Sequence, residues 1–395
     1  MNESRGAPPG VVRGRAWAEI DLDALRHNVE VLRAAADPAD VMVVVKADAY
    51  GHGLLACAAA ARQAGASWLG VALLSEALEL RAAGDTGPLL CWLSVPGDPF
   101  GACLEADIDL SAYGPQMLTE IADAARATGR RARVHLKVDT GLSRGGAVEP
   151  WDAFFALASE LERDGTIEAV GLWSHLAYAD EPEHPTIALQ LAAFERAVTA
   201  AHAAGLRPRW RHLANSAATL RLPETHYDLV RPGIAAYGIS PGPAVGTEAA
   251  LDLRPVMTLK GRFALVKELP AGVGVSYGHT YTTEADTVVG LVPLGYADGI
   301  PRAASNVGPV LADGHRCTVA GRVCMDQFVV DLGAGSAAVA GDELTLFGDP
   351  RNGCPSASDW ARATDTIGYE IVTRVGPRVP RLQAVGEVAT SSGGE

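Results

Sequence analysis

The chain has 395 residues, of which 48% are hydrophobic and 20% charged, as expected for a globular protein of roughly two or three domains. The formal net charge of −14 disfavours binding to nucleic acid, because the phosphate backbone would be repelled. No apolar run approaches the roughly 18–20 residues of a membrane span, and the first residues lack the apolar core of a signal peptide. These features indicate a cytoplasmic protein that binds neither nucleic acid nor membrane.

The first two-thirds of the chain alternate short apolar runs with segments of helical periodicity. Residues 1–13 predict a flexible tail, and residues 17–36 a short strand followed by a helix that Asp21 or Asp23 caps. Eight apolar runs of strand length follow, beginning at Val41, Trp68, Pro88, Ile108, Ala132, Ala169, Trp210 and Tyr227. This alternation predicts a (β/α)8 TIM-type barrel over residues 14–245. A doubly wound sheet is the alternative, because the pattern alone does not show closure.

The pattern changes after a Gly/Pro-rich stretch at residues 240–247, which predicts a linker. Short strands separated by turns then predict a mostly β C-terminal domain over residues 246–388, followed by a tail at 389–395. The six cysteines show no CxxC spacing, and no His, Cys or Asp cluster has metal-ligand spacing. We therefore expect reduced cysteines and no metal site.

Polar residues cluster where the predicted strands end, the edge at which barrel enzymes build their active sites. Lys46 ends the first apolar run and is either a reactive amine of lowered pKa or a surface lysine. Ser216 and the turn at 231–234 follow the last two strands, where barrels commonly hold a phosphate. A lysine together with a phosphate cradle suggests pyridoxal 5′-phosphate (PLP), with Arg231 beside its ring nitrogen.

Nine motifs follow one another along the chain: VVVKADAYGHG, HLKVDTGLSRGG, WSHLAYAD, HLANSAA, LVRPGIAAYG, VSYGHTY, LGYADG, GRVCMDQ and IGYEIVTRVGPRVPR. Together they resemble the motifs of the bacterial alanine racemases. With the opening WAEIDLDAL, the resemblance extends from Trp17 to about Arg381. It implies a PLP-dependent barrel whose N-terminal strand, here near residues 16–20, joins the β domain. It also implies racemisation of L- and D-alanine, supplying D-alanine for cell-wall peptidoglycan.

The resemblance implies a role for each matching residue. Lys46 would hold the cofactor and handle the proton on the D side, and Tyr277 would act on the opposite face from the partner subunit of a homodimer. Further cofactor contacts would be Tyr50, Arg144, His175, Ser216, Arg231, Gly233, Ile234 and Tyr369. The substrate would contact Arg144, Met325 and Tyr296, and Lys137 matches a lysine often carbamylated to N6-carboxylysine. Leu142 and Ser143 replace the Met-Gly common in the family, which leaves the pocket around Arg144 open to variation.

Three alternatives differ in testable ways. A non-catalytic PLP carrier would lack the β domain. Amino-acid decarboxylases with the same two-domain architecture are similar to a pattern with Glu at the pyridine nitrogen, and Arg231 argues against them. A serine or broad-spectrum racemase could keep the same catalytic pair. Among the remaining polar residues, Asp48 and Asp298 are interpreted as turn or capping carboxylates. His27, His184, His202 and His226 are expected to be exposed.

Overall fold

The computed structural model describes residues 14–384, which form two compact units. One unit is residues 22–254, and the other combines the described residues before Leu22 with those from Pro255 onward. The tails expected at 1–13 and 389–395 lie outside the described residues.

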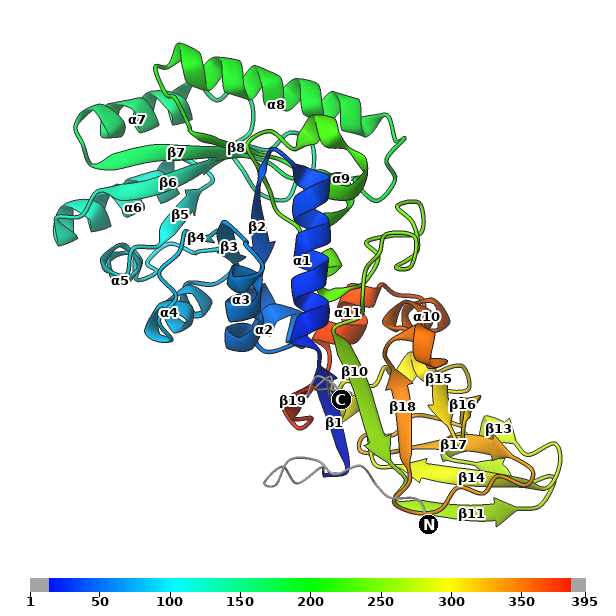
Figure 1. The fold of residues 1–395 in the computed structure, drawn as a ribbon. Coiled ribbons are helices and arrows are strands. Elements are labelled where there is room, and N and C mark those ends of the chain that lie inside the picture. Colours follow the sequence, from blue (N-terminus) through cyan, green and yellow to red (C-terminus); the bar gives the residue numbers. More distant parts are fainter. Residues whose placement is uncertain (1–13, 385–395) are drawn as a thin grey trace, which may run out of the picture. The chain divides into compact units, whose positions relative to one another are not determined.

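The first unit is an eight-stranded parallel barrel with helices around it (Figure 1). Its strands are hydrogen-bonded in the order β8-β7-β6-β5-β4-β3-β2-β9. The N–H groups of Asp228 and Arg231 donate to the carbonyls of Arg211 and Ala214, which joins the β8 and β9 segments and closes the ring. The barrel prediction is confirmed, and the doubly wound alternative is wrong because that sheet would have two open edges. The strands are β2 (Asp40–Val44), β3 (Trp68–Val71), β4 (Leu89–Cys91), β5 (Asp109–Ala112), β6 (Ala132–Lys137), β7 (Ile167–Trp173), β8 (Trp210–His212) and β9 (Leu229–Val230).

Helices connect successive strands of the barrel, and α8 is the longest of them, with 18 residues. Pro115 begins α6, where its missing N–H is not needed, and Gly129 ends that helix in the left-handed conformation. The helical elements are α1 (Leu22–Ala36), α2 (Lys46–Gly51), α3 (Leu54–Gln63), α4 (Leu74–Ala82), α5 (Phe100–Glu105), α6 (Pro115–Thr128), α7 (Asp152–Arg163), α8 (Thr186–Ala203), α9 (Ser216–Arg221), and the 3-10 turns η1 (Pro223–Thr225) and η2 (Ile234–Tyr237).

Polar side chains and tryptophans fill much of the barrel interior. Because alternate residues of a strand share one face, β6 directs Arg133, His135 and Lys137 to the same side. His135 contacts His212 of β8, and the Lys137 ammonium lies 4.5 Å from the ring centre of Trp173, so this shared face is the interior. The interior therefore carries titratable groups from the amino ends of the strands to their carboxyl ends.

The second unit is mostly β, as predicted. Its main sheet has nine strands in the order β11-β14-β17-β16-β15-β18-β10-β1-β19, and β12 and β13 form a separate pair. Strand β1 (Ala16–Ile20) pairs antiparallel with β10 and parallel with β19. The other elements are β10 (Met257–Arg262), β11 (Leu265–Leu269), β12 (Gly274–Val275), η3 (Tyr277–His279), β13 (Tyr281–Thr282), β14 (Thr287–Val292), η4 (Tyr296–Asp298), η5 (Arg302–Ala304), β15 (Pro309–Ala312), β16 (His315–Ala320), β17 (Phe328–Gly333), β18 (Glu343–Phe347), η6 (Pro350–Asn352), α10 (Ala357–Ala363), α11 (Gly368–Thr373) and β19 (Arg381–Gln383).

The boundary between the units lies later than the Gly/Pro-rich stretch suggested. Residues 246–254 belong to the barrel unit rather than to the β unit. The buried Asn28 side chain on α1 donates to the Arg254 carbonyl and accepts from the Arg254 N–H, both at 2.8 Å. This pair of hydrogen bonds fixes the segment against the barrel, so the division falls between Arg254 and Pro255.

Two further observations concern the part of the chain that the structure describes. None of the helices within residues 14–384 is long and apolar enough to cross a membrane. All six cysteines lie in this range and are free thiols, five of them buried.

Candidate active site

Lys46 begins a turn of unusual handedness at the carboxyl end of β2. The next four residues, 47–50, have φ between 53° and 55°, so they form a left-handed helical turn. This conformation costs about 1–2 kcal/mol for each L-residue, and surrounding hydrogen bonds must offset that cost. The Glu76 carboxylate accepts from the Ala47 N–H at 2.6 Å, and the Asp48 carboxylate accepts from the Leu54 N–H at 2.7 Å. Asp48 thus caps the start of α3, as expected.

The environment of Lys46 lowers the pKa of its amine. Burial and the nearby positive charge of Arg144 lower the pKa of the Lys46 amine, and the carboxylate of Glu76 partly offsets this by raising it. An amine of lowered pKa is a better nucleophile near neutral pH. The surface-lysine alternative is therefore less consistent with the structure than the reactive amine.

Hydroxyls and backbone N–H groups meet where the last two strands of the barrel end. Asn215 caps α9, and the Ser216 hydroxyl accepts from the N–H groups of Gly233 and Ala235 at 2.8 and 3.3 Å. A Cβ at Gly233 would overlap the Tyr50 hydroxyl and lie 2.9 Å from Cζ of that ring. Only glycine leaves room for the Tyr50 hydroxyl at this position. Ile234 is the next residue and begins η2. The set fits a phosphate group, which binds to clustered hydroxyl and N–H donors.

Four positive groups surround His175 at the same edge of the barrel. Burial lowers the pKa of His175 well below its usual value, and the charges of Arg231, Arg144, Lys137 and Lys46 lower it further, in that order. Lys137 itself has a pKa lowered to about 8 by burial and by the charges of Arg144 and Arg231. The structure thus brings these predicted residues together in a region suited to anionic ligands.

Arg231 is buried and acts as a hydrogen-bond donor to several groups. Its Nη2 donates to the Ser174 carbonyl at 2.8 Å and to His175 Nδ1 at 3.3 Å, and its Nη1 donates to His212 Nδ1 at 3.0 Å. Burial lowers the pKa of the Arg231 guanidinium to about 9, so the neighbouring acceptors are needed to stabilise its charge. A guanidinium has no hydrogen-bond acceptor, so Arg231 is the donor in every hydrogen bond that it makes.

Tyr277, Tyr296, Met325 and Tyr369 lie in the β-rich unit. The first three are large side chains with exposed fractions of 72%, 43% and 54%. Their segments are linked, because the Tyr296 N–H donates to the Cys324 carbonyl at 3.0 Å and the Ser276 hydroxyl donates to the Arg322 carbonyl at 2.8 Å. Tyr369 lies in α11, in the same unit.

The backbone next to Tyr277 and the η4 turn is held in place locally. Ser276 has φ 61° and ψ −171°, a region that glycine adopts readily and other residues rarely do. Asp298 is buried and accepts from the Gly295 N–H at 2.9 Å and from Arg15, so it is the turn carboxylate that we expected.

Two buried histidines, His135 and His212, were not predicted to have a role. Their signal in the sequence was a polar residue at every second position of an otherwise apolar strand, as in 133–137. The expectation that His226 is exposed is wrong, because its ring is buried and its Nε2 lies 3.0 Å from the Thr219 carbonyl. Over residues 14–384, no group of His, Cys, Asp or Glu side chains is arranged to hold a metal ion.

Comparison with known proteins identifies the family. The model of the alanine racemase N-terminal domain matches residues 20–241, and that of the alanine racemase C-terminal domain matches residues 256–383. The chain belongs to the alanine racemase family. The alanine racemase of Frankia casuarinae is 56% identical over 382 residues, covering 96% of this chain and 99% of that protein. That of Streptomyces coelicolor is 56% identical over 375 residues, covering 93% and 95%.

Solved structures of alanine racemases share the fold. The crystal structure of alanine racemase from Streptomyces lavendulae has a TM-score of 0.93 and 55% identity, covering 95% of this chain and 98% of that one. The alanine racemase of Clostridium difficile is 33% identical and still has a TM-score of 0.88, covering 95% and 97%. The alanine racemase family consists of PLP-dependent isomerases with a barrel and a mostly β domain, which is the architecture found here.

Proposed function

We propose that this chain interconverts L- and D-alanine with PLP held on Lys46. The observation that carries the proposal is a half-buried Lys46 of lowered pKa on the barrel edge that also bears the Ser216–Gly233 cradle. Tyr50, Ser216, Gly233, Ile234 and Tyr369 would hold the phosphate. When bound, PLP supplies an electron sink that makes the Cα–H bond of an attached amino acid acidic.

The hydrogen-bond chemistry of Arg231 supports racemisation over competing reactions. Arg231 keeps its protons, so it offers the pyridine nitrogen a hydrogen bond without transferring a proton. This limits the negative charge that is drawn away from Cα, and favours return of a proton to Cα over transamination. His175, beside Arg231, would complete this side of the cofactor site.

Racemisation needs a proton removed from one face of Cα and another delivered to the opposite face. We propose that Lys46 serves the D side and Tyr277 the opposite side. Arg144 and Met325 would bind the substrate carboxylate, with Tyr296 at the entrance. Two relatives support a small amino-acid-like ligand: the Bacillus anthracis alanine racemase was solved with bound L-Ala-P, and that of Clostridium difficile in complex with cycloserine.

We further propose a homodimer in which Tyr277 completes the site of the partner subunit. The large exposed fractions of Tyr277 and Met325 support this, because exposed aromatic and Met side chains are typical of interfaces. Mixing inactive Lys46→Ala and Tyr277→Phe proteins should restore partial activity, since one heterodimer site would have both bases. No recovery despite verified subunit exchange would contradict shared sites.

Lys137 would carry a carbamate that orients Arg144. In the cell, the enzyme would be cytoplasmic and would supply D-alanine for peptidoglycan.

Borohydride reduction followed by peptide mapping tests the assignment of Lys46. The pyridoxyl group should be found on Lys46, and the untreated protein should racemise alanine faster than other amino acids in a panel of L-isomers. A label on another lysine would contradict the assignment, and equal rates with serine would favour a broader racemase.

A further inference from the structure

A line of buried polar side chains runs through the barrel interior to Arg231. Arg231 Nη1 lies 3.0 Å from His212 Nδ1, and His212 Nε2 lies 2.9 Å from His135 Nδ1. His135 Nε2 lies 3.4 Å from Asp109 Oδ2, and the other Asp109 oxygen accepts from Arg133 Nε at 2.6 Å. His135 and His212 are both fully buried, and Asp109 is 1% exposed. The line joins the amino ends of the strands to the proposed cofactor edge.

The two ends of this line fix the direction of every hydrogen bond in it. A guanidinium only donates, so His212 Nδ1 is an acceptor and the His212 proton is on Nε2. That N–H donates to His135 Nδ1, which leaves the His135 proton on Nε2, directed at Asp109. Neither His135 Nε2 nor Asp109 Oδ2 has a hydrogen-bond partner among the described residues, so the two atoms face each other at 3.4 Å as a close contact of opposite polarity. Oδ2 faces His135 as an acceptor oxygen of the Asp109 carboxylate, so both ends require the same direction.

Packing holds both imidazole rings in this arrangement. A Cβ at Gly171 would overlap His135 Nδ1 and lie 2.6 Å from Cγ of that ring, so only glycine admits His135 here. The edge of Trp68 contacts His135, with ring centres 5.4 Å apart. Trp173 stacks on His212 at 5.5 Å with an angle of 6° between the planes. A ring flip of either histidine would therefore require its neighbours to move.

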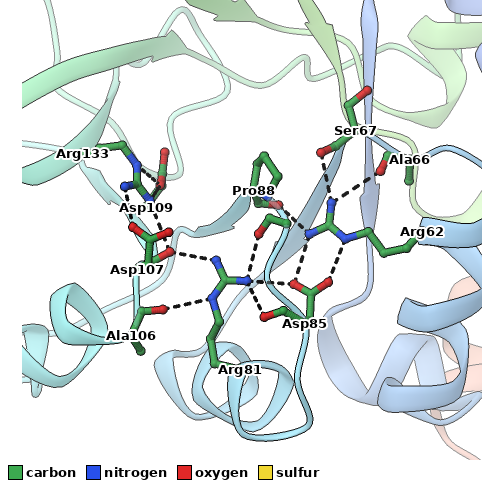
Figure 2. A network of polar contacts seen from close by, with 11 residues as sticks. Arg62, Ala66, Ser67, Arg81, Asp85, Pro88, Ala106, Asp107, Asp109 and Arg133 are labelled. Carbon is green, nitrogen blue, oxygen red and sulfur yellow. Dashed lines mark hydrogen bonds and ion pairs between the residues drawn. The ribbon is translucent and has the colours of Figure 1, made fainter.

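Asp109 is anchored by a network of arginines and carboxylates at the amino ends of the strands (Figure 2). Arg133 bridges Asp109 and the exposed Asp107, each at 2.6 Å. Arg81 donates to the Asp107 carbonyl at 2.8 Å and to Asp85, which also accepts from Arg62. Asp107 shares Arg133 with Asp109 but, within the described part of the chain, forms no hydrogen bond or ion pair with His135, and so provides a matched control.

We propose that Asp109, His135 and His212 form a one-directional chain that keeps an acceptor nitrogen facing Arg231 and so fixes the orientation of its guanidinium. Two links of the chain are hydrogen bonds, Arg231 to His212 and His212 to His135, and the third is the 3.4 Å contact of His135 with the Asp109 carboxylate. These three are positioning residues, because none of them is assigned to a substrate or cofactor contact. Reversing the chain would turn an N–H of His212 toward the N–H of Arg231, and the two donors would repel. The consequence for the cofactor rests on the proposed function, whereas the tautomers do not.

Asp109→Asn should reverse the chain. Because Arg133 holds Oδ1, the amide oxygen of the variant would keep that place and its NH2 group would face His135 Nε2. His135 must then accept at Nε2 and carry its proton on Nδ1, and His212 Nδ1 becomes a donor toward Arg231. In Asp107→Asn the chain should be unchanged.

Nitrogen-15 NMR of the histidine rings tests the tautomers in protein stripped of PLP and in the holoenzyme. The wild-type protein and Asp107→Asn should show His135 and His212 neutral with the proton on Nε2, and Asp109→Asn should move the His135 proton to Nδ1. A wild-type Nδ1–H tautomer or a protonated ring at either histidine would overturn the proposal without any variant.

The reaction provides the second measurement. In the holoenzyme, the ratio of racemisation to transamination turnovers should fall at least tenfold in Asp109→Asn and stay unchanged in Asp107→Asn. A reversed tautomer with an unchanged ratio would refute the positioning role. Wild-type protein that takes up no PLP would instead refute the proposed function, and the tautomers of the stripped protein would still decide the chain.

Discussion

Replacing Glu76 tests the strained turn that presents Lys46. One oxygen of the Glu76 carboxylate accepts from the Ala47 N–H at 2.6 Å, at the first residue of the left-handed turn. The other accepts from the N–H groups of Ala72 and Leu73, both at 3.0 Å, at the start of α4. A single side chain therefore holds the turn after β2 against the helix after β3.

The loss of stability expected when Glu76 is replaced follows from these three hydrogen bonds. Losing the helix cap costs about 0.5–2 kcal/mol, and losing a hydrogen bond to a charged group about 1.5–3 kcal/mol. Glu76→Ala should therefore lower the free energy of unfolding by roughly 2–5 kcal/mol. Glu76→Gln should lose about half as much, because its amide nitrogen cannot accept. Both variants remove the negative charge that raises the pKa of Lys46, so that pKa should fall further.

Urea unfolding measures the free energy, and an amine-reactive reagent with peptide mapping measures the titration of Lys46 in PLP-free protein. Glu79→Ala is the control, because Glu79 is exposed on the same helix. Surface substitutions typically change the free energy of unfolding by no more than about 0.5 kcal/mol. If the free energies of unfolding of Glu76→Ala and Glu79→Ala differ by no more than this, and Lys46 of Glu76→Ala titrates at the wild-type pH, the predicted role of Glu76 is wrong.

Two further predictions concern the cofactor site. Gly233→Ala forces a Cβ against Tyr50, and such overpacking costs about 1–3 kcal/mol. A PLP titration of this variant should therefore show roughly 5- to 150-fold weaker binding. Gly114→Ala is the control and should bind PLP normally, because its Cβ meets nothing within 4 Å. With a pKa of about 8, Lys137 is roughly one-tenth unprotonated at pH 7, against on the order of one part in 3,000 for an ordinary lysine. Because CO₂ adds only to the free amine, the carbamate signal in ¹³C NMR with ¹³CO₂ should rise between about pH 6 and 9; a bare ammonium in bicarbonate at mildly alkaline pH would contradict it. Lys137→Ala should also lower activity, with partial rescue by small carboxylates.

The sequence predicts the barrel well because its strands are local and strongly patterned. Each apolar run is buried by the helices around it, so its composition alone marks it as a strand. Candidate site residues at the strand ends could be proposed because a lysine or arginine closing an apolar run is costly without a partner. Long motifs such as VVVKADAYGHG then assigned roles that composition could not.

Other features depend on contacts that no local pattern shows. The sequence Ala-Asp-Ala-Tyr gives no sign of a left-handed turn, which depends on Glu76 about 30 residues further along the chain. The pair His135 and His212 is 77 residues apart and forms only because β6 and β8 both face the barrel interior. The unit boundary likewise depends on Asn28, which binds Arg254 from 226 residues away.

Hydrogen exchange at Cα in D₂O tests the two-base assignment most directly. Tyr277→Phe keeps Lys46 and lacks the opposite base, so the variant should exchange the α-hydrogen of D-alanine with retention of configuration. It should exchange that of L-alanine far more slowly, and form almost no L-alanine from D-alanine. Equal exchange of both enantiomers by Tyr277→Phe, or racemisation at the wild-type rate, would contradict the account.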